Sequence, residues 1–129
     1  MYNIIYYTTE NDNCPVKSFL YELSKDKSNL RILTKIELYI KMLAEYGPSI
    51  NIKYKRVACK LVDSKNGIYE LRPDNVRVFY FYNDNNQRYV LLHGFIKKKN
   101  RAEAEIQKAI KEKKDYVRRF NNECKWFII

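Results

Sequence analysis

The first third of the chain alternates between apolar runs and polar breaks in a way that predicts one strand and two helices. Residues 2–8, "YNIIYYT", are β-branched and aromatic and precede the turn formers "ENDNCP", which favours a strand. Pro15 suits the first turn of a helix, whose apolar face would be formed by Phe19, Leu20 and Leu23. A second helix is predicted because apolar residues recur at spacings of three and four, at Leu33, Ile36, Ile40 and Leu43. "YGP" at 46–48 would end it, so the two helices form a hairpin.

From residue 56 onward the pattern changes to an alternation of period two, which predicts strands. Turn formers separate four candidates, "RVACKLV", "GIYELR", "VRVFYFY" and "RYVLLHGFI" (56–62, 67–72, 76–82 and 88–96). Such short connections favour an antiparallel meander, since a parallel crossover needs about a dozen residues or more. A last helix is predicted from Arg101, with apolar positions at Ala102, Ile106, Ala109, Ile110, Val117 and Phe120.

Together these elements predict one domain, residues 1–129, of the α+β class. It would combine a twisted antiparallel β-sheet meander with an N-terminal helical hairpin and a C-terminal helix. The helices are expected to cover one face of the sheet. The other face, or one end of the sheet, would then be available for function.

Composition adds a strong positive charge. The chain carries 25 Lys and Arg against 15 Asp and Glu, a net charge of +10, which favours a polyanionic partner such as nucleic acid or an acidic protein. Its 12 Tyr and 6 Phe suit either core and sheet packing or a binding face.

Cysteine usage and hydropathy narrow the class further. Cys14, Cys59 and Cys124 lie far apart and form no CxxC pair, so reduced thiols are expected, with no disulfide framework, metal site or cofactor. No apolar run approaches the ~18 residues of a membrane span. The start "MYNIIYYTTEND" lacks the pattern of a signal peptide. A cytoplasmic protein without membrane contact is expected.

Hairpin geometry predicts that cations from separate segments converge. With turns centred in "PDN" and "NDNNQ", Arg72 lies opposite Arg77, and Arg77 lies opposite Gly94. Gly94 has no side chain, so a phosphate could approach closely there. Beyond the same end of the sheet come Lys97, Lys98 and Lys99. Like charges gathered in this way repel one another and become useful when a polyanion lies among them.

Two alternatives accompany this interpretation. The triple lysine could be a solvated helix entry, and the two arginines could pair with Glu70 and Asp74. His93, the single histidine, could transfer protons near neutral pH, or it could be a hydrogen-bonded structural residue. Its face depends on the strand register, which a slip of one residue would reverse.

The same region carries a recognisable series of motifs. "ELR" at 70–72 is followed by Arg77 and an aromatic strand, then by "HGF" at 93–95. Two lysines and a helix with an "EI…A…DY" pattern complete it, at Lys97, Lys98, Glu105, Ile106, Ala109, Asp115 and Tyr116. In these motifs the C-terminal half resembles the RelE/HigB superfamily of toxins, especially its phage-derived HigB-like branch.

The resemblance implies a RelE-like fold and a type II toxin–antitoxin toxin. Such a toxin is an mRNA interferase, an endoribonuclease that usually acts on the ribosome, and it needs no metal. Its partner would be a HigA-like antitoxin, often with a helix-turn-helix. An alternative of another class is a non-catalytic basic module that binds RNA or protein and inhibits translation or regulates transcription.

Residue roles follow from this chemistry. Guanidinium groups hold phosphate with paired hydrogen bonds, and lysines add positive charge. The candidate catalytic residues are Glu70, Arg72, Arg77, His93, Lys97 and Lys98. The candidate RNA-binding residues are Tyr69, Lys99 and Tyr116. The two tyrosines could stack on a base or simply pack in the sheet and helix.

Overall fold

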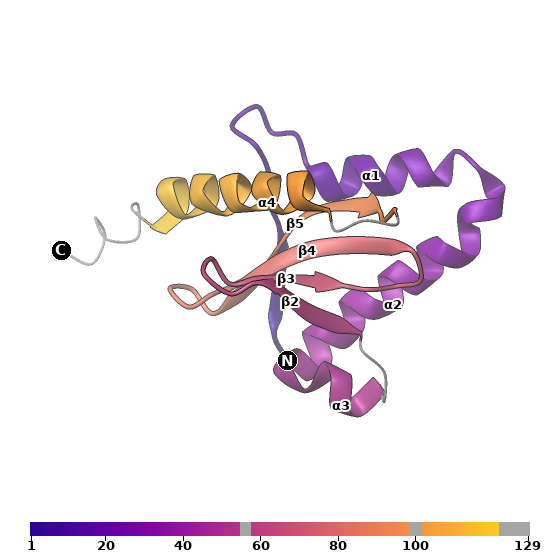
Figure 1. Ribbon diagram of the computed structural model, residues 1–129, viewed down its shortest axis with the longest axis horizontal. Helices are drawn as coiled ribbons and strands as arrows, with labels where there is room; N and C mark the ends of the chain where they lie inside the picture. Colours follow the sequence, from indigo (N-terminus) through magenta and orange to yellow (C-terminus); the bar gives the residue numbers. More distant parts are fainter. Residues whose placement is uncertain (55–57, 99–101, 122–129) are drawn as a thin grey trace.

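The computed structural model describes residues 1–54, 58–98 and 102–121 and contains a mixed five-stranded sheet (Figure 1). The strands lie in the order β1-β5-β4-β3-β2. Their bounds are β1 Asn3–Tyr6, β2 Cys59–Asp63, β3 Ile68–Leu71, β4 Val76–Asn83 and β5 Arg88–Ile96. The predicted meander β2–β5 is confirmed, with each pair antiparallel. β1 adds a parallel edge strand beside β5.

The helices also follow the predicted order. The N-terminal hairpin comprises α1 (Pro15–Ser24) and α2 (Leu30–Tyr46), joined across a 3₁₀ turn. Gly47 ends α2 with φ of 52°, a conformation that glycine adopts readily. A short α3 (Ile50–Tyr54), which the pattern did not predict, follows it. α4 (Glu103–Tyr116) continues into a π-helical turn. No helix in the described part of the chain has the length and hydropathy to cross a membrane.

The expectation that the helices cover a single face of the sheet was wrong. Val78 and Tyr80 of β4 point into the core under α1 and α2, whereas Phe79 and Phe81 point into a second core under α4. In Figure 1, α4 runs above the sheet and α2 and α3 lie below it. Successive strand residues face opposite sides, so "VFYF" at 78–81 is hydrophobic at every position because both faces of β4 are buried there. Because both faces are covered at the centre of the sheet, a binding site is expected near its edges and ends.

The register agrees with the prediction in one hairpin and departs from it in the next. Leu71 pairs with Val78, as the first turn implies. Arg77, however, pairs with Phe95 rather than with Gly94. The ladder shifts between Phe79 and Tyr80 because β5 carries one extra residue, a β-bulge that turn formers do not reveal.

Candidate functional site

A cavity of about 250 Å³ opens on the α4 side of the sheet. All strands of the meander contribute to it, and the start of α4 borders it. Its lining residues are Lys60, Leu61, Val62, Glu70, Phe79, Phe95, Lys97, Ala102 and Ile106. Together with the two arginines that contact Glu70, described next, we call this cavity the cationic hollow.

Glu70 is the centre of the charges. Its Oε2 atom lies 3.4 Å from Nε of Arg72 and 3.6 Å from Nε of Arg77. Glu70 and Arg77 are 6% and 7% exposed, so this ion pairing is largely shielded from water. Both Nε atoms are nevertheless buried donors without a hydrogen-bond partner, a costly arrangement. The arginines thus pair with Glu70 electrostatically while retaining hydrogen-bonding capacity.

The Arg77 guanidinium is positioned by the hairpin turn beside it. Its Nη1 donates to the backbone carbonyls of Asp74 and Val76, each at 2.8 Å. The pKa of Arg77 lies below its usual value, chiefly because the side chain is buried. The negative charge of Glu70 opposes this shift, and the positive charge of Arg72 adds to it. The Asp74 carboxylate does not join this group, because it pairs with Lys35. The alternative that both arginines pair with acidic side chains therefore holds for Glu70 and not for Asp74.

The lysines after β5 differ in their placement. Lys97 lines the hollow, and its backbone N–H donates to the carbonyl of Asn75 at 2.7 Å. Lys98 is exposed and is not among the lining residues, and Lys99 lies outside the described residues. The space at Gly94 is not open to a phosphate, because a Cβ there would lie 2.6 Å from Cδ2 of Phe19 in α1. That expectation was wrong, since the bulge directs Gly94 toward α1.

His93 lies beneath α4 rather than in the cationic hollow. It is 2% exposed, with Nδ1 at 2.5 Å from Glu112 Oε1 and Nε2 at 2.9 Å from Glu105 Oε2. Both ring nitrogens are thus occupied by carboxylate oxygens of α4. The geometry favours the structural alternative, with Glu105 as the link toward the solvent.

The two tyrosines proposed to bind RNA are also separated from the hollow. Tyr69 lies on the opposite face of the sheet, stacked on Tyr80 with ring centroids 5.6 Å apart. Tyr116 is 4% exposed at the far end of α4, where its hydroxyl accepts from Asn86. The placement of Tyr116 favours packing over base stacking.

Sequence reasoning missed Lys60, which lines the hollow from β2 and pairs with Glu70 across the ladder. In "CKLV" the polar Lys60 stands between two apolar residues, which would indicate that it faces the same side of the sheet as its partner Glu70. The strand is irregular, however, with a register shift after Leu61. No group of three His, Cys, Asp or Glu side chains within the described ranges could hold a metal ion.

A family model described as phage derived protein Gp49-like (DUF891) matches residues 19–114, which include the Glu70–Arg72–Arg77 group and every lining residue of the hollow. The chain belongs to this Gp49-like family. The Gp49-like family is a phage-derived, RelE/HigB-like toxin family, so membership implies a toxin and an antitoxin partner. A search of the curated proteins found no match.

Proposed function

We propose that this Gp49-like chain is a HigB-like toxin of a type II toxin–antitoxin system, an mRNA interferase that cleaves mRNA on the ribosome without a metal ion. The observation that carries the proposal is the cationic hollow. Lys60 and Lys97 line the cavity together with Glu70, and Arg72 and Arg77 contact that carboxylate, so four cations are grouped with one anion. A phosphodiester supplies the missing negative charge.

RNA cleavage without a metal requires the 2′-hydroxyl to attack the adjacent phosphorus while the 5′-oxygen leaves. Arg72 and Arg77 would stabilise the charge of the pentacoordinate phosphate, and an incoming phosphate oxygen would satisfy their unpaired donors. Lys97 would neutralise a second oxygen, and Lys98 would approach the neighbouring phosphate from the exposed side.

Proton transfer is assigned to Glu70, the carboxylate that lines the cavity. A phosphate that recruits the arginines would free Glu70 to accept the 2′ proton. As the P–O5′ bond breaks, the 2′,3′-cyclic phosphate forms and the 5′-oxygen leaves as a hydroxyl after taking a proton from water or from Glu70. His93 would position Glu105, which contacts it and is about one third exposed, rather than touch RNA or transfer a proton. The remaining proposed partners are the translating ribosome and a HigA-like antitoxin with a helix-turn-helix.

The deciding experiment is primer extension on mRNA after expression of Arg77→Ala and Arg77→Lys variants. Each should reduce cleavage by about 10²–10³-fold, because one positioned donor to the transition state is lost and lysine cannot replace the guanidinium fork. Arg88→Ala is the matched control, since Arg88 is exposed at the opposite end of β5 from Ile96. A folded Arg77→Ala protein that still cuts mRNA and arrests growth contradicts the proposal.

A second candidate is the non-catalytic RNA-binding module, favoured by the contacts that already occupy Glu70 and His93. Cleavage products with new 5′ ends in the presence of a chelator support the nuclease. Binding to ribosomes or RNA without new ends supports the module.

A further inference from the structure

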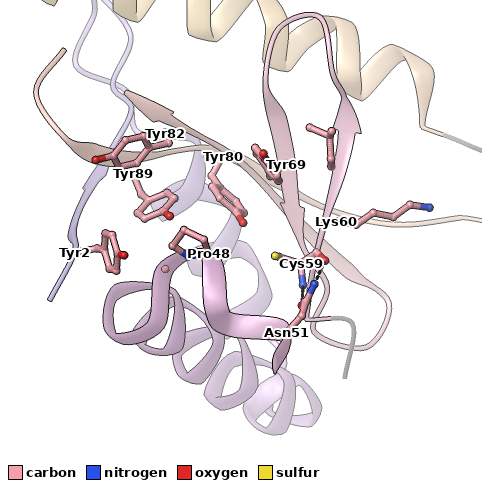
Figure 2. A pocket seen from close by; sticks show the side chains of 11 residues that line it. Tyr2, Pro48, Asn51, Cys59, Lys60, Tyr69, Tyr80, Tyr82 and Tyr89 are labelled. Atoms are coloured by element: carbon pink, nitrogen blue, oxygen red, sulfur yellow. Dashed lines mark hydrogen bonds between the residues drawn. The ribbon is translucent and has the colours of Figure 1, made fainter. Parts of the chain in front are cut away.

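A second, larger cavity lies on the other face of the sheet, beside α3 and the turn before it (Figure 2). Its volume is about 800 Å³, and five tyrosines dominate its walls. We call this set the tyrosine box: Tyr2, Tyr69, Tyr80, Tyr82 and Tyr89. The rings come from three strands and the N-terminal segment, and no residue of the proposed cleavage chemistry except Lys60 borders them.

The box has a buried floor and an accessible rim. Tyr80 and Tyr89 are 3% and 5% exposed, whereas Tyr2 and Tyr69 at the rim are 38% and 36% exposed. Tyr89 makes edge-to-face contacts with three of the other rings at centroid distances of 5.6, 5.7 and 4.9 Å. Gly47 permits this arrangement, because a Cβ there would lie 2.4 Å from the ring of Tyr2. The rings are thus held in place before any ligand arrives.

The polarity of the box selects a particular kind of occupant. Among the described residues that line it there is no carboxylate, and Lys60 stands at its border. A cationic ligand would therefore find no counter-charge among these residues, although aromatic cages often bind cations. Burial raises the pKa of Tyr89 to about 12, so its phenol stays protonated and can donate a hydrogen bond. The Asn51 amide is already engaged with the backbone of Cys59. A flat, uncharged ring bearing an anion fits these walls.

The edge strand β2 connects the tyrosine box to the cationic hollow. Lys60 and Leu61 line both cavities. Lys60 pairs with Glu70 on the α4 side, and Leu61 pairs with Tyr69 on the tyrosine side. Since β2 is the last strand of the sheet, a flexible chain can pass around it from one cavity to the other.

We propose that the tyrosine box binds a nucleobase of the same single-stranded RNA whose phosphate enters the cationic hollow. The base stacks on Tyr69 at the rim, its phosphate contacts Lys60, and the strand crosses β2. This inference rests on the proposal that the substrate is RNA. It adds a base-binding subsite on the far face of the sheet from the cleavage chemistry, at residues that include Tyr2, outside the family-matched segment.

The test is an NMR titration of protein with ¹³C-labelled tyrosine rings, using adenosine 5′-monophosphate and, as the probe without a base, ribose 5-phosphate. The nucleotide should shift the ring signals of the box, and ribose 5-phosphate should not. Tyr69→Leu should weaken nucleotide binding about tenfold, the value of one lost stacking contact, while Tyr69→Phe should bind as the wild type does. Tyr21→Leu is the matched control, because Tyr21 is exposed on α1 outside the box.

Equal shifts from both probes, no shift of the box signals, or full affinity in Tyr69→Leu would overturn the inference. So would ring signals that respond to the antitoxin and not to the nucleotide, since the occupant would then be a peptide. If the nucleotide fails to bind while Arg77→Ala still abolishes cleavage, the base subsite is wrong and the proposed nuclease stands. If the nucleotide binds but the wild type leaves mRNA intact, the nuclease proposal is the one that fails.

Discussion

At the scale of single residues, Glu70 has two different tasks in one position. As a counterion it keeps Arg72 and Arg77 from repelling each other inside a largely buried site. It also lines the hollow, where in the proposed nuclease it would accept the 2′ proton of RNA. A substitution that removes the charge of Glu70 but keeps its shape should affect folding stability through the first task and cleavage through the second.

Glu70→Gln separates them. We expect a loss of about 2 kcal/mol in the free energy of unfolding, because two guanidinium groups lose their shared anion. Cleavage by the folded fraction should fall at every pH, because the amide of glutamine cannot accept the 2′ proton. Urea denaturation and a pH series of cleavage rates measure the two effects. Glu45→Gln, on an exposed carboxylate of α2, is the control. A variant that cleaves at the wild-type rate across the pH range would rule out Glu70 as the base.

The sequence predicts that Glu70, Arg72 and Arg77 lie together, but it predicts their individual contacts less well. Turn chemistry in "PDN" sets the register of β3 and β4, so the convergence of Arg72 and Arg77 follows from local signals. The partner of Gly94 depends on the bulge in β5, and a bulge is decided by packing against helices distant in sequence. Lys60 was missed for a similar reason, because its strand carries few alternating residues and a register shift.

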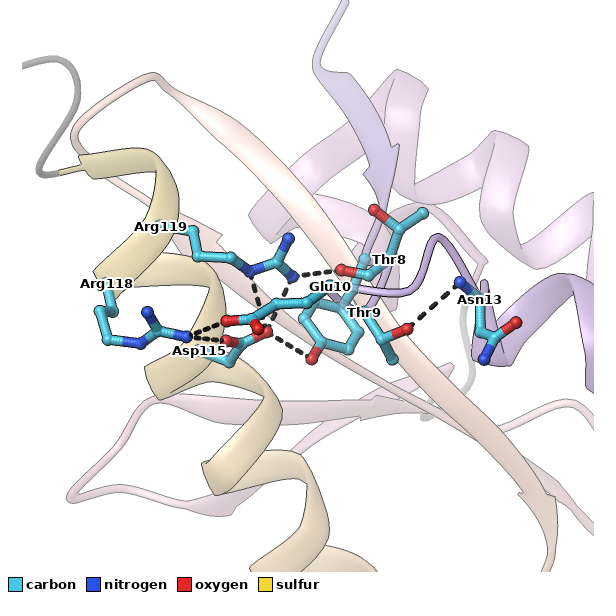
Figure 3. Close-up of polar contacts among 8 residues, drawn as sticks. Thr8, Thr9, Glu10, Asn13, Asp115, Arg118 and Arg119 are labelled. Atoms are coloured by element: carbon cyan, nitrogen blue, oxygen red, sulfur yellow. Dashed lines mark hydrogen bonds and ion pairs between the residues drawn. The ribbon is translucent and has the colours of Figure 1, made fainter.

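At the scale of elements, α4 is fixed to the sheet by polar contacts at both ends. His93 of β5 contacts Glu105 in the first turn of α4 and Glu112 two turns later. Near its end, Asp115 accepts a hydrogen bond from Tyr7, and just beyond it Arg118 and Arg119 contact Glu10 and Thr8 of the loop after β1 (Figure 3). Helical periodicity predicted α4 itself. It could not predict which sheet face α4 covers, since that choice depends on long-range packing.

His93→Gln tests the anchor near the start of α4. Removing the ring leaves Glu112 buried at 7% exposure, and we expect a loss of about 3 kcal/mol in the free energy of unfolding. Cleavage per folded molecule should be preserved if His93 only positions α4. Denaturant titration and cleavage rates corrected for the folded fraction provide the measurement. A stable His93→Gln protein without cleavage would instead make His93 a participant in proton transfer.

Asp115 gives the far end of α4 a dependence on pH. Hydrogen bonds from Arg119 chiefly, and from Tyr7 and Arg118, lower the pKa of Asp115 below its ordinary value of 3.8. A lowered carboxylate pKa stabilises the fold above the unfolded value and is lost as pH falls through the folded value. The thermal midpoint should therefore decline below about pH 4, and less so in Asp115→Asn. Glu45→Gln should retain the wild-type decline, and an unchanged decline in Asp115→Asn would show that acid acts elsewhere.

At the scale of the whole molecule, the mixed sheet puts the two cavities on opposite faces and joins them at the β2 edge. The net charge of +10 attracts a polyanion from any direction, but it does not direct that polyanion to one place. In the proposed complex, the RNA strand is placed by the cations that contact its phosphates, and each such contact releases counterions. The salt dependence of binding therefore measures the number of phosphate contacts.

The last prediction uses this count. For single-stranded nucleic acid, log K falls with log salt by about 0.7 per phosphate contact. If Lys60, Arg72, Arg77 and Lys97 each take a phosphate charge, binding of a 2′-O-methyl RNA, which cannot be cleaved, should have a slope of about −3. Arg77→Ala should make the slope shallower by about 0.7, whereas Arg88→Ala should leave it unchanged. Fluorescence anisotropy over a salt series measures both. Equal slopes for the two variants would mean that Arg77 stays with Glu70 in the complex and that the hollow does not hold the RNA backbone.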